Sequence, residues 1–127
     1  MLDHLGYLTD SISGTSEAFR SLGYLAGKTI HDSRQRASIC MLTGESGPDI
    51  ELVEPDEDNR SLRKLLSSSG VSPYHLCLKT TDIDAEYERM VEDGWTPLFE
   101  PVQAPALGGR RICYFWRREA GLIEIVE

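Results

Sequence analysis

The feature that most constrains this 127-residue chain is an internal duplication in which a histidine and a glutamate recur at nearly the same spacing. His4 lies in an apolar, strand-like run, and Glu51 follows it 47 residues later in another such run. His75 and Glu124 repeat the pattern at a spacing of 49 residues. Burying an imidazole or a carboxylate in a strand costs free energy unless a partner or a metal satisfies it. The repeat therefore indicates four inward-pointing ligands, two from each half, around one metal ion.

A second correspondence supports the duplication. The segment Ile39–Leu42 matches Ile112–Phe115 at an offset of 73 residues, which is also the offset between the two glutamates. The two histidines are 71 residues apart, so a small insertion or deletion lies between the first and third strands of the repeat. The units are too few and too long for a solenoid, and two fused copies of one unit explain the pattern better.

Apolar periodicity predicts the elements of each copy. The expected strands are 2–8, 26–31, 37–43, 48–54, 73–79, 96–99, 110–117 and 121–126, and the expected helices are 15–23, 60–69 and 82–93. This order reads strand–helix–strand–strand–strand twice. The sequence thus predicts an α+β fold in a single domain, 1–127. Two tandem βαβββ modules, 1–56 and 73–127, are joined by a helical linker, 57–72, and form a curved mixed sheet around a metal-binding pocket.

Strand alternation sorts the side chains between the two faces of this sheet, because successive residues of a strand point to opposite sides. The residues of opposite parity to the four candidate ligands are apolar and are expected to pack against helices: Ile50, Leu52, Leu76, Leu78, Ile123 and Ile125. The four ligands then share the other, concave face. Glu54 and Glu127 have the wrong parity for that face, and His31 has no counterpart and is expected at the surface.

Composition excludes several functions. The net charge is −8 with no basic cluster, which argues against nucleic acid or an anionic membrane as a partner. No apolar stretch is long enough to span a bilayer, and no secretion signal is recognisable. The three widely separated cysteines, Cys40, Cys77 and Cys113, are typical of reduced, buried thiols in a cytoplasmic protein.

The predicted ligand set favours metal-assisted chemistry at a carbonyl. Two imidazoles and two carboxylates suit a divalent Zn, Ni, Co, Mn or Fe ion, and the sequence does not choose among them. Such a metal polarises a carbonyl and stabilises an enolate, while Glu51 or Glu124 moves the proton. Arg110 and Arg111 follow two glycines, and we consider them candidates for binding an anionic part of the substrate, the alternative being an ordinary turn with exposed arginines.

Nearly the whole chain resembles the vicinal oxygen chelate superfamily, which includes glyoxalases, bleomycin-resistance proteins and dioxygenases. Four segments look most like the methylmalonyl-CoA epimerase branch: Ile50–Pro55, Tyr74–Leu76 leading to Thr81–Asp84, Gly108–Arg111 and Gly121–Glu124. The resemblance implies metal ligands at His4, Glu51, His75 and Glu124, a small-molecule substrate such as a CoA thioester, and a homodimer.

One departure from the epimerase pattern matters for the reaction. Epimerases of this branch can use a further carboxylate from the strand before Glu51, but here that strand, Ala37–Thr43, contains no acidic residue or histidine. Glu51 and Glu124 would then share proton transfer, as a resemblance to glyoxalase I allows. A glyoxalase I-type lyase acting on a hemithioacetal and a non-catalytic, antibiotic-sequestering protein are the alternatives to an epimerase.

Overall fold

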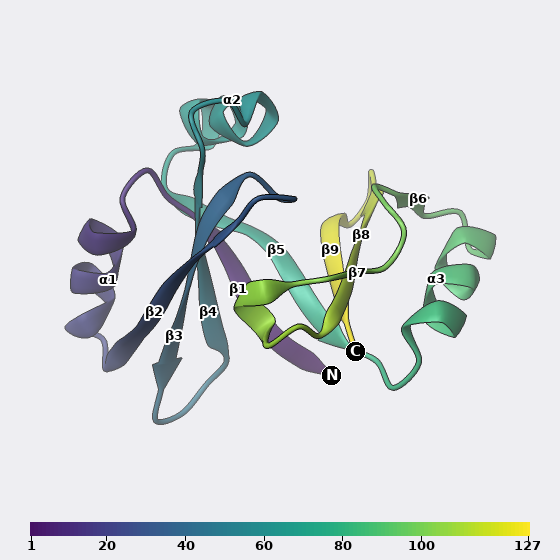
Figure 1. Ribbon diagram of the computed structural model, residues 1–127, viewed down its shortest axis with the longest axis horizontal. Coiled ribbons are helices and arrows are strands. Elements are labelled where there is room, and N and C mark those ends of the chain that lie inside the picture. Colours follow the sequence, from purple (N-terminus) through teal and green to yellow (C-terminus); the bar gives the residue numbers. More distant parts are fainter.

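Nine strands form one curved sheet in the computed structural model, which describes residues 1–127 (Figure 1). The strands are β1 Leu2–Leu8, β2 Tyr24–Asp32, β3 Ala37–Gly44, β4 Asp49–Pro55, β5 Ser72–Lys79, β6 Thr96–Pro97, β7 Val102–Gln103, β8 Arg111–Arg117 and β9 Gly121–Val126. The helices are α1 Ile12–Arg20, α2 Arg60–Ser69 and α3 Ile83–Glu92, with a short 3₁₀ turn η1 at Pro105–Leu107. The predicted α+β fold with a curved mixed sheet is confirmed.

The sheet has a nearly symmetric strand order, β2-β3-β4-β1-β5-β9-β8-β6, with β7 paired to β8. In each half the first strand pairs in parallel with the last: β1 with β4, and β5 with β9. The halves join where β1 and β5 run antiparallel. The four strands that carry the candidate ligands are therefore adjacent at the centre of the sheet. The exact division into modules at residues 56 and 73 stays a prediction.

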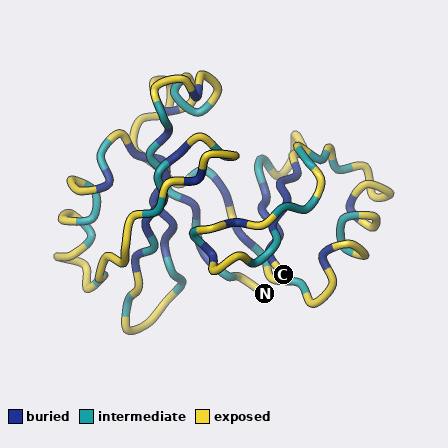
Figure 2. Tube along the Cα trace, in the orientation of Figure 1, coloured by how far each residue is buried: buried dark blue, intermediate teal, exposed yellow.

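The outer helices cover the face predicted for them. Ile50 and Leu52 pack in one cluster with Ile12 of α1. A second cluster joins Ile123 and Ile125 to the α3 residues Ile83 and Met90, with Leu78 packed against it. Figure 2 shows the buried residues concentrated along the strands and the exposed ones along the helices and turns.

Leu76 is the exception to this packing. It has the predicted parity but is 43% exposed, because α1 and α3 cover the two flanks of the sheet (Figure 1) and neither packs on the centre of β5.

Helix α1 begins three residues earlier than predicted. The Ser11 side chain accepts a hydrogen bond from the Gly14 backbone N–H, which caps the helix ahead of Ile12. The prediction missed this cap because Gly14 lowers the helical propensity of the first turn. Helix α3 is capped by Asp82, and Gly94 follows it with φ of 88°.

The segment between α3 and β8 crosses the concave side of the sheet. Strand β6 is shorter than predicted, and neither β7 nor η1 was predicted. The η1 turn lies against β2 and β3 of the other half (Figure 1). Its Leu107 packs with Cys77 and Tyr114, and Met41 of β3 packs against the same cluster. This segment therefore shields the centre of the concave face from solvent.

Cys40, Cys77 and Cys113 are all free and buried, as expected. The longest helices have ten residues, and none is long and apolar enough to cross a membrane.

Candidate metal centre

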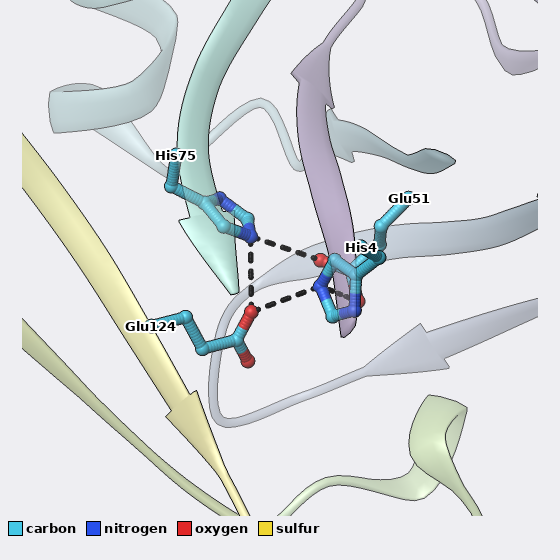
Figure 3. Close-up of side chains that lie close together, drawn as sticks. All are labelled: His4, Glu51, His75 and Glu124. Carbon is cyan, nitrogen blue, oxygen red and sulfur yellow. Dashed lines mark hydrogen bonds and ion pairs between the residues drawn. The ribbon is translucent and has the colours of Figure 1, made fainter. Parts of the chain in front are cut away.

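The four predicted ligands meet at one point on the concave face (Figure 3). One ligand atom from each of His4, Glu51, His75 and Glu124 lies within 4.8 Å of the others. His4 Nε2 is 3.1 Å from Glu124 Oε2 and 3.5 Å from Glu51 Oε2. His75 Nε2 is 2.9 Å from the same Glu124 oxygen and 3.7 Å from Glu51 Oε1. Each residue is no more than 4% exposed, so the cluster is a fully buried charge site.

These separations fit a metal ion. Ligand bonds of about 2.0–2.2 Å place neighbouring ligand atoms about 3.0 Å apart in octahedral geometry and about 3.4 Å apart in tetrahedral geometry. The four distances in the cluster, 2.9 to 3.7 Å, lie around these values.

The ring of His75 supplies an independent indication. Both of its nitrogens are buried without a hydrogen-bond partner, although Nε2 approaches Glu124. A buried imidazole nitrogen without a partner is costly, and a cation at the centre of the cluster would satisfy Nε2. The residues present therefore fit a divalent metal.

The electrostatics of the cluster show the same need for positive charge. Burial lowers the pKa of His4, but Glu124, Glu51 and Asp3 outweigh it and raise that pKa to about 9. Burial and the nearby Glu124 raise the pKa of Glu51 to about 8. Burial also acts to raise the pKa of Glu124, but the two imidazoles lower it to about 2. Both raised pKa values favour the protonated forms of His4 and Glu51, and a divalent cation would take the place of those protons.

Asp3 orients one of the histidines. Its Oδ1 lies 2.8 Å from His4 Nδ1, and its Oδ2 lies 3.1 Å from Arg110 Nη1 and 3.6 Å from Lys79 Nζ. Burial raises the pKa of Asp3, but Arg110 and His4 outweigh it and hold the pKa below its usual value. An ionised carboxylate only accepts, so Nδ1 of His4 carries the hydrogen and Nε2 faces the cluster.

Gly6 makes room for the other histidine. A Cβ at this position would lie 2.0 to 2.5 Å from three atoms of the His75 ring. Glycine is therefore required where β1 passes beneath His75. Sequence reasoning missed this role, although a glycine inside a predicted strand signals close approach of another group.

The two arginines proposed for substrate binding lie in different places. Arg110 contacts Asp3 at the edge of the cluster, where it supports His4 indirectly. Arg111 pairs with Asp84 and Glu127. It shares its face of β8 with Cys113, which packs in the α3 cluster, so its side chain lies on the opposite side of the sheet from the four ligands.

The other sequence-based exclusions agree with the structure. The Glu54 carboxylate accepts a hydrogen bond from the Ile12 N–H at the start of α1, away from the cluster. His31 is exposed and lies 2.8 Å from Asp56. Met41 pairs with Glu51 across β3 and β4, and it occupies the place where a third-strand carboxylate would face the site.

Comparison with known proteins identifies the class. Residues 3–114 match the Glyoxalase/Bleomycin resistance protein/Dioxygenase superfamily, and the chain belongs to this superfamily. No curated protein matches the chain.

Solved structures show the same fold at low identity. A hypothetical protein from Bacillus halodurans C-125 is 23% identical with a TM-score of 0.86, covering 100% of this chain and 93% of its own. Methylmalonyl-CoA epimerase from Mycobacterium tuberculosis is 24% identical with a TM-score of 0.87, covering 99% and 86%. A variant of the Streptomyces coelicolor epimerase in complex with 2-nitronate-propionyl-CoA is 24% identical with a TM-score of 0.85, covering 98% and 92%. This likeness shows the shared fold.

Proposed function

We propose that this protein is a metal-dependent enzyme that abstracts a proton next to the carbonyl of an acyl thioester, with 2-epimerisation of a methylmalonyl-CoA-like substrate as the reaction. The observation that carries the proposal is the convergence of His4, Glu51, His75 and Glu124 within 4.8 Å in a buried site. The fold shared with methylmalonyl-CoA epimerases supports the choice of substrate class.

Different residues of the site would have different roles in such a reaction. The four side chains would hold one divalent metal, which supplies Lewis-acid polarisation of the substrate carbonyl when bound. Glu51 is the better candidate to move the proton, because its oxygens lie 3.5 and 3.7 Å from the imidazoles while Glu124 is held at 2.9 and 3.1 Å. The more loosely held carboxylate has more freedom to approach substrate. Leu107 and Met41 pack over the face of the sheet that carries the four ligands, and there they exclude water from the cluster.

The proposal is tested first by metal content and then by exchange. We expect native protein to carry about one divalent metal per chain, as determined by elemental analysis, and His75→Ala protein to carry much less. The metal-loaded enzyme should exchange the C2 proton of methylmalonyl-CoA for solvent deuterium, and the variant should not. The matched control is His31→Ala, which removes an exposed imidazole outside the cluster and should change neither result.

The same measurements separate the two alternatives. Metal-loaded protein that turns over a glutathione hemithioacetal, but leaves C2 of methylmalonyl-CoA unexchanged, is a glyoxalase I-type lyase. Protein that binds a small molecule without tightly held metal is a sequestering protein, and this result would sink the proposal.

A further inference from the structure

Two buried polar residues outside the metal cluster hold one turn in a fixed shape. Asp32, 2% exposed, accepts hydrogen bonds from the backbone N–H groups of Arg34 and Gln35 and from the Gln35 side chain. Asn59, 4% exposed, donates to the carbonyls of Gln35 and Arg36. Arg36 also adopts a left-handed backbone conformation, with φ of 49°, that side chains rarely take. The turn between β2 and β3 is therefore a rigid support for two exposed arginines.

This turn forms the mouth of a groove whose aromatic wall packs against His75 of the metal cluster. Arg34 and Arg36 line its outer end, and Tyr74, Phe99, Tyr114 and Leu122 line the rest. The rings of Tyr74 and Tyr114 lie 4.5 and 5.2 Å from the ring of His75. The groove is thus polar and cationic at the surface, aromatic within, and adjacent to a candidate ligand at its inner end.

The inner end contains a hydroxyl without a normal hydrogen-bond partner. Tyr114 is 5% exposed, and its Oη makes no hydrogen bond of normal length, although the neighbouring Tyr74 hydroxyl is close enough to interact with it weakly. Tyr114 also lies opposite Glu124 in the β8–β9 pairing. A buried hydroxyl without a normal acceptor is costly, and a ligand group that reaches this end of the groove would satisfy it.

The outer end has an unpaired positive charge. Arg36 lies 3.9 Å from Asp58, so its charge is partly compensated. Arg34 is exposed and has no carboxylate within ion-pair distance. In a chain of net charge −8, an uncompensated guanidinium on a rigid turn at a groove mouth favours an anionic ligand group. The planar guanidinium suits phosphate, to which it can donate two parallel hydrogen bonds.

The volume of the groove limits how much of a ligand it can enclose. Its volume is about 230 Å³, below the range of about 300–1,000 Å³ for pockets that enclose a whole drug-sized ligand. We propose that it encloses the acyl and thioester end of a coenzyme A thioester, with Tyr114 donating a hydrogen bond to the enclosed end and Arg34 pairing with a phosphate outside the mouth. This inference rests on the proposed function and assigns the groups that select its substrate.

Calorimetric titration of the zinc-loaded protein tests the assignment. The probes are propionyl-CoA and S-propionyl-pantetheine, which has the same acyl arm without phosphates. We expect Arg34→Ala to weaken propionyl-CoA binding about fivefold, less at high salt, and to leave propionyl-pantetheine binding unchanged. Tyr114→Phe should weaken both probes equally. The control Arg20→Ala makes the same charge change on α1, far from the groove, and should weaken neither.

Three results would overturn the assignment: no propionyl-CoA binding by the wild-type protein, equal weakening of both probes by Arg34→Ala, or no weakening of either. S-hexylglutathione carries carboxylates and no phosphate, so it shows which kind of anion Arg34 binds. If Arg34→Ala weakens the binding of this probe alone, the result also contradicts the assignment of a phosphate to Arg34. The titrations measure binding and do not require turnover. Arg34-dependent binding without C2 exchange therefore contradicts only the proposed reaction, and C2 exchange without an Arg34 effect contradicts only the groove assignment.

Discussion

Asp3 Oδ1 lies 2.8 Å from His4 Nδ1, so adjacent residues of one strand provide a candidate metal ligand and the carboxylate that orients it. Arg110 holds the other Asp3 oxygen at 3.1 Å. The segment that crosses the concave face is thereby linked to the cluster through a chain of charged contacts.

Replacing this carboxylate should weaken metal binding without removing a ligand. We expect Asp3→Asn to raise the dissociation constant for Zn²⁺ about 10- to 100-fold, because the imidazole loses a strong acceptor and with it basicity. Competition with a chromophoric chelator measures the constant. The control Asp10→Asn alters an exposed residue and should have no effect. An unchanged constant in Asp3→Asn would show that the His4 orientation does not depend on this charge.

A single methyl group should displace His75. Gly6→Ala places a Cβ at 2.0 to 2.5 Å from the ring, and neither the strand backbone nor the buried imidazole can move aside without losing the cluster geometry. We expect metal content below about a tenth of the wild-type value, since one ligand in four is lost. Gly27→Ala is the matched control, because its Cβ would be 3.3 Å from the nearest atom, the Met41 carbonyl oxygen. Full metal content in Gly6→Ala contradicts the prediction.

The stabilisation conferred by metal should grow as pH rises from about 6 to 9. In metal-free protein the pKa of His4 is raised from 6.5 to about 9, so its contribution to stability is complete below 6.5 and is lost by 9. The pKa of Glu51 is raised from 4.5 to about 8, so the folded state is progressively disfavoured across that interval. Metal binding needs both groups deprotonated, and its affinity therefore rises over the range in which the metal-free protein weakens.

The measurement is the difference in melting temperature between zinc-loaded and chelator-treated protein at several pH values. A difference that stays constant or shrinks from pH 6 to 9 contradicts this account. In the His4→Ala variant the difference should be small at every pH, because the variant lacks a metal ligand as well as the raised imidazole pKa.

Asn59 should matter for stability as well as for the groove. Its side chain accepts from the Leu62 N–H at the start of α2 and donates to two carbonyls of the β2–β3 turn. Asn59→Ala removes a helix cap and leaves the Gln35 carbonyl without a donor, whereas the Arg36 carbonyl keeps the Asp56 N–H. We expect a loss of about 2 kcal/mol in the free energy of unfolding, measured by urea denaturation. Ser68→Ala, at an exposed position of the same helix, should cost well under 1 kcal/mol.

The candidate ligands could be found from the sequence because their signal is local and repeated. His4, Glu51, His75 and Glu124 interrupt apolar runs, and strand parity alone places them on one face. The same parity places Ile50 and Ile125 against the helices, which the structure bears out. The face of the sheet predicted for Leu76 was right, but the prediction that a helix packs against it was wrong, since parity does not say whether a helix covers that face.

The duplicated α+β architecture and the four residues that it brings together could therefore be predicted from the chain alone, because both follow from its periodicity. The tertiary structure decided the roles of Asp3, Gly6 and Arg110. It also decided that Tyr114 and Arg34 line one groove, although 80 residues separate them in the sequence. These relationships depend on contacts between strands, turns and loops, and such contacts leave no periodic trace in the chain itself.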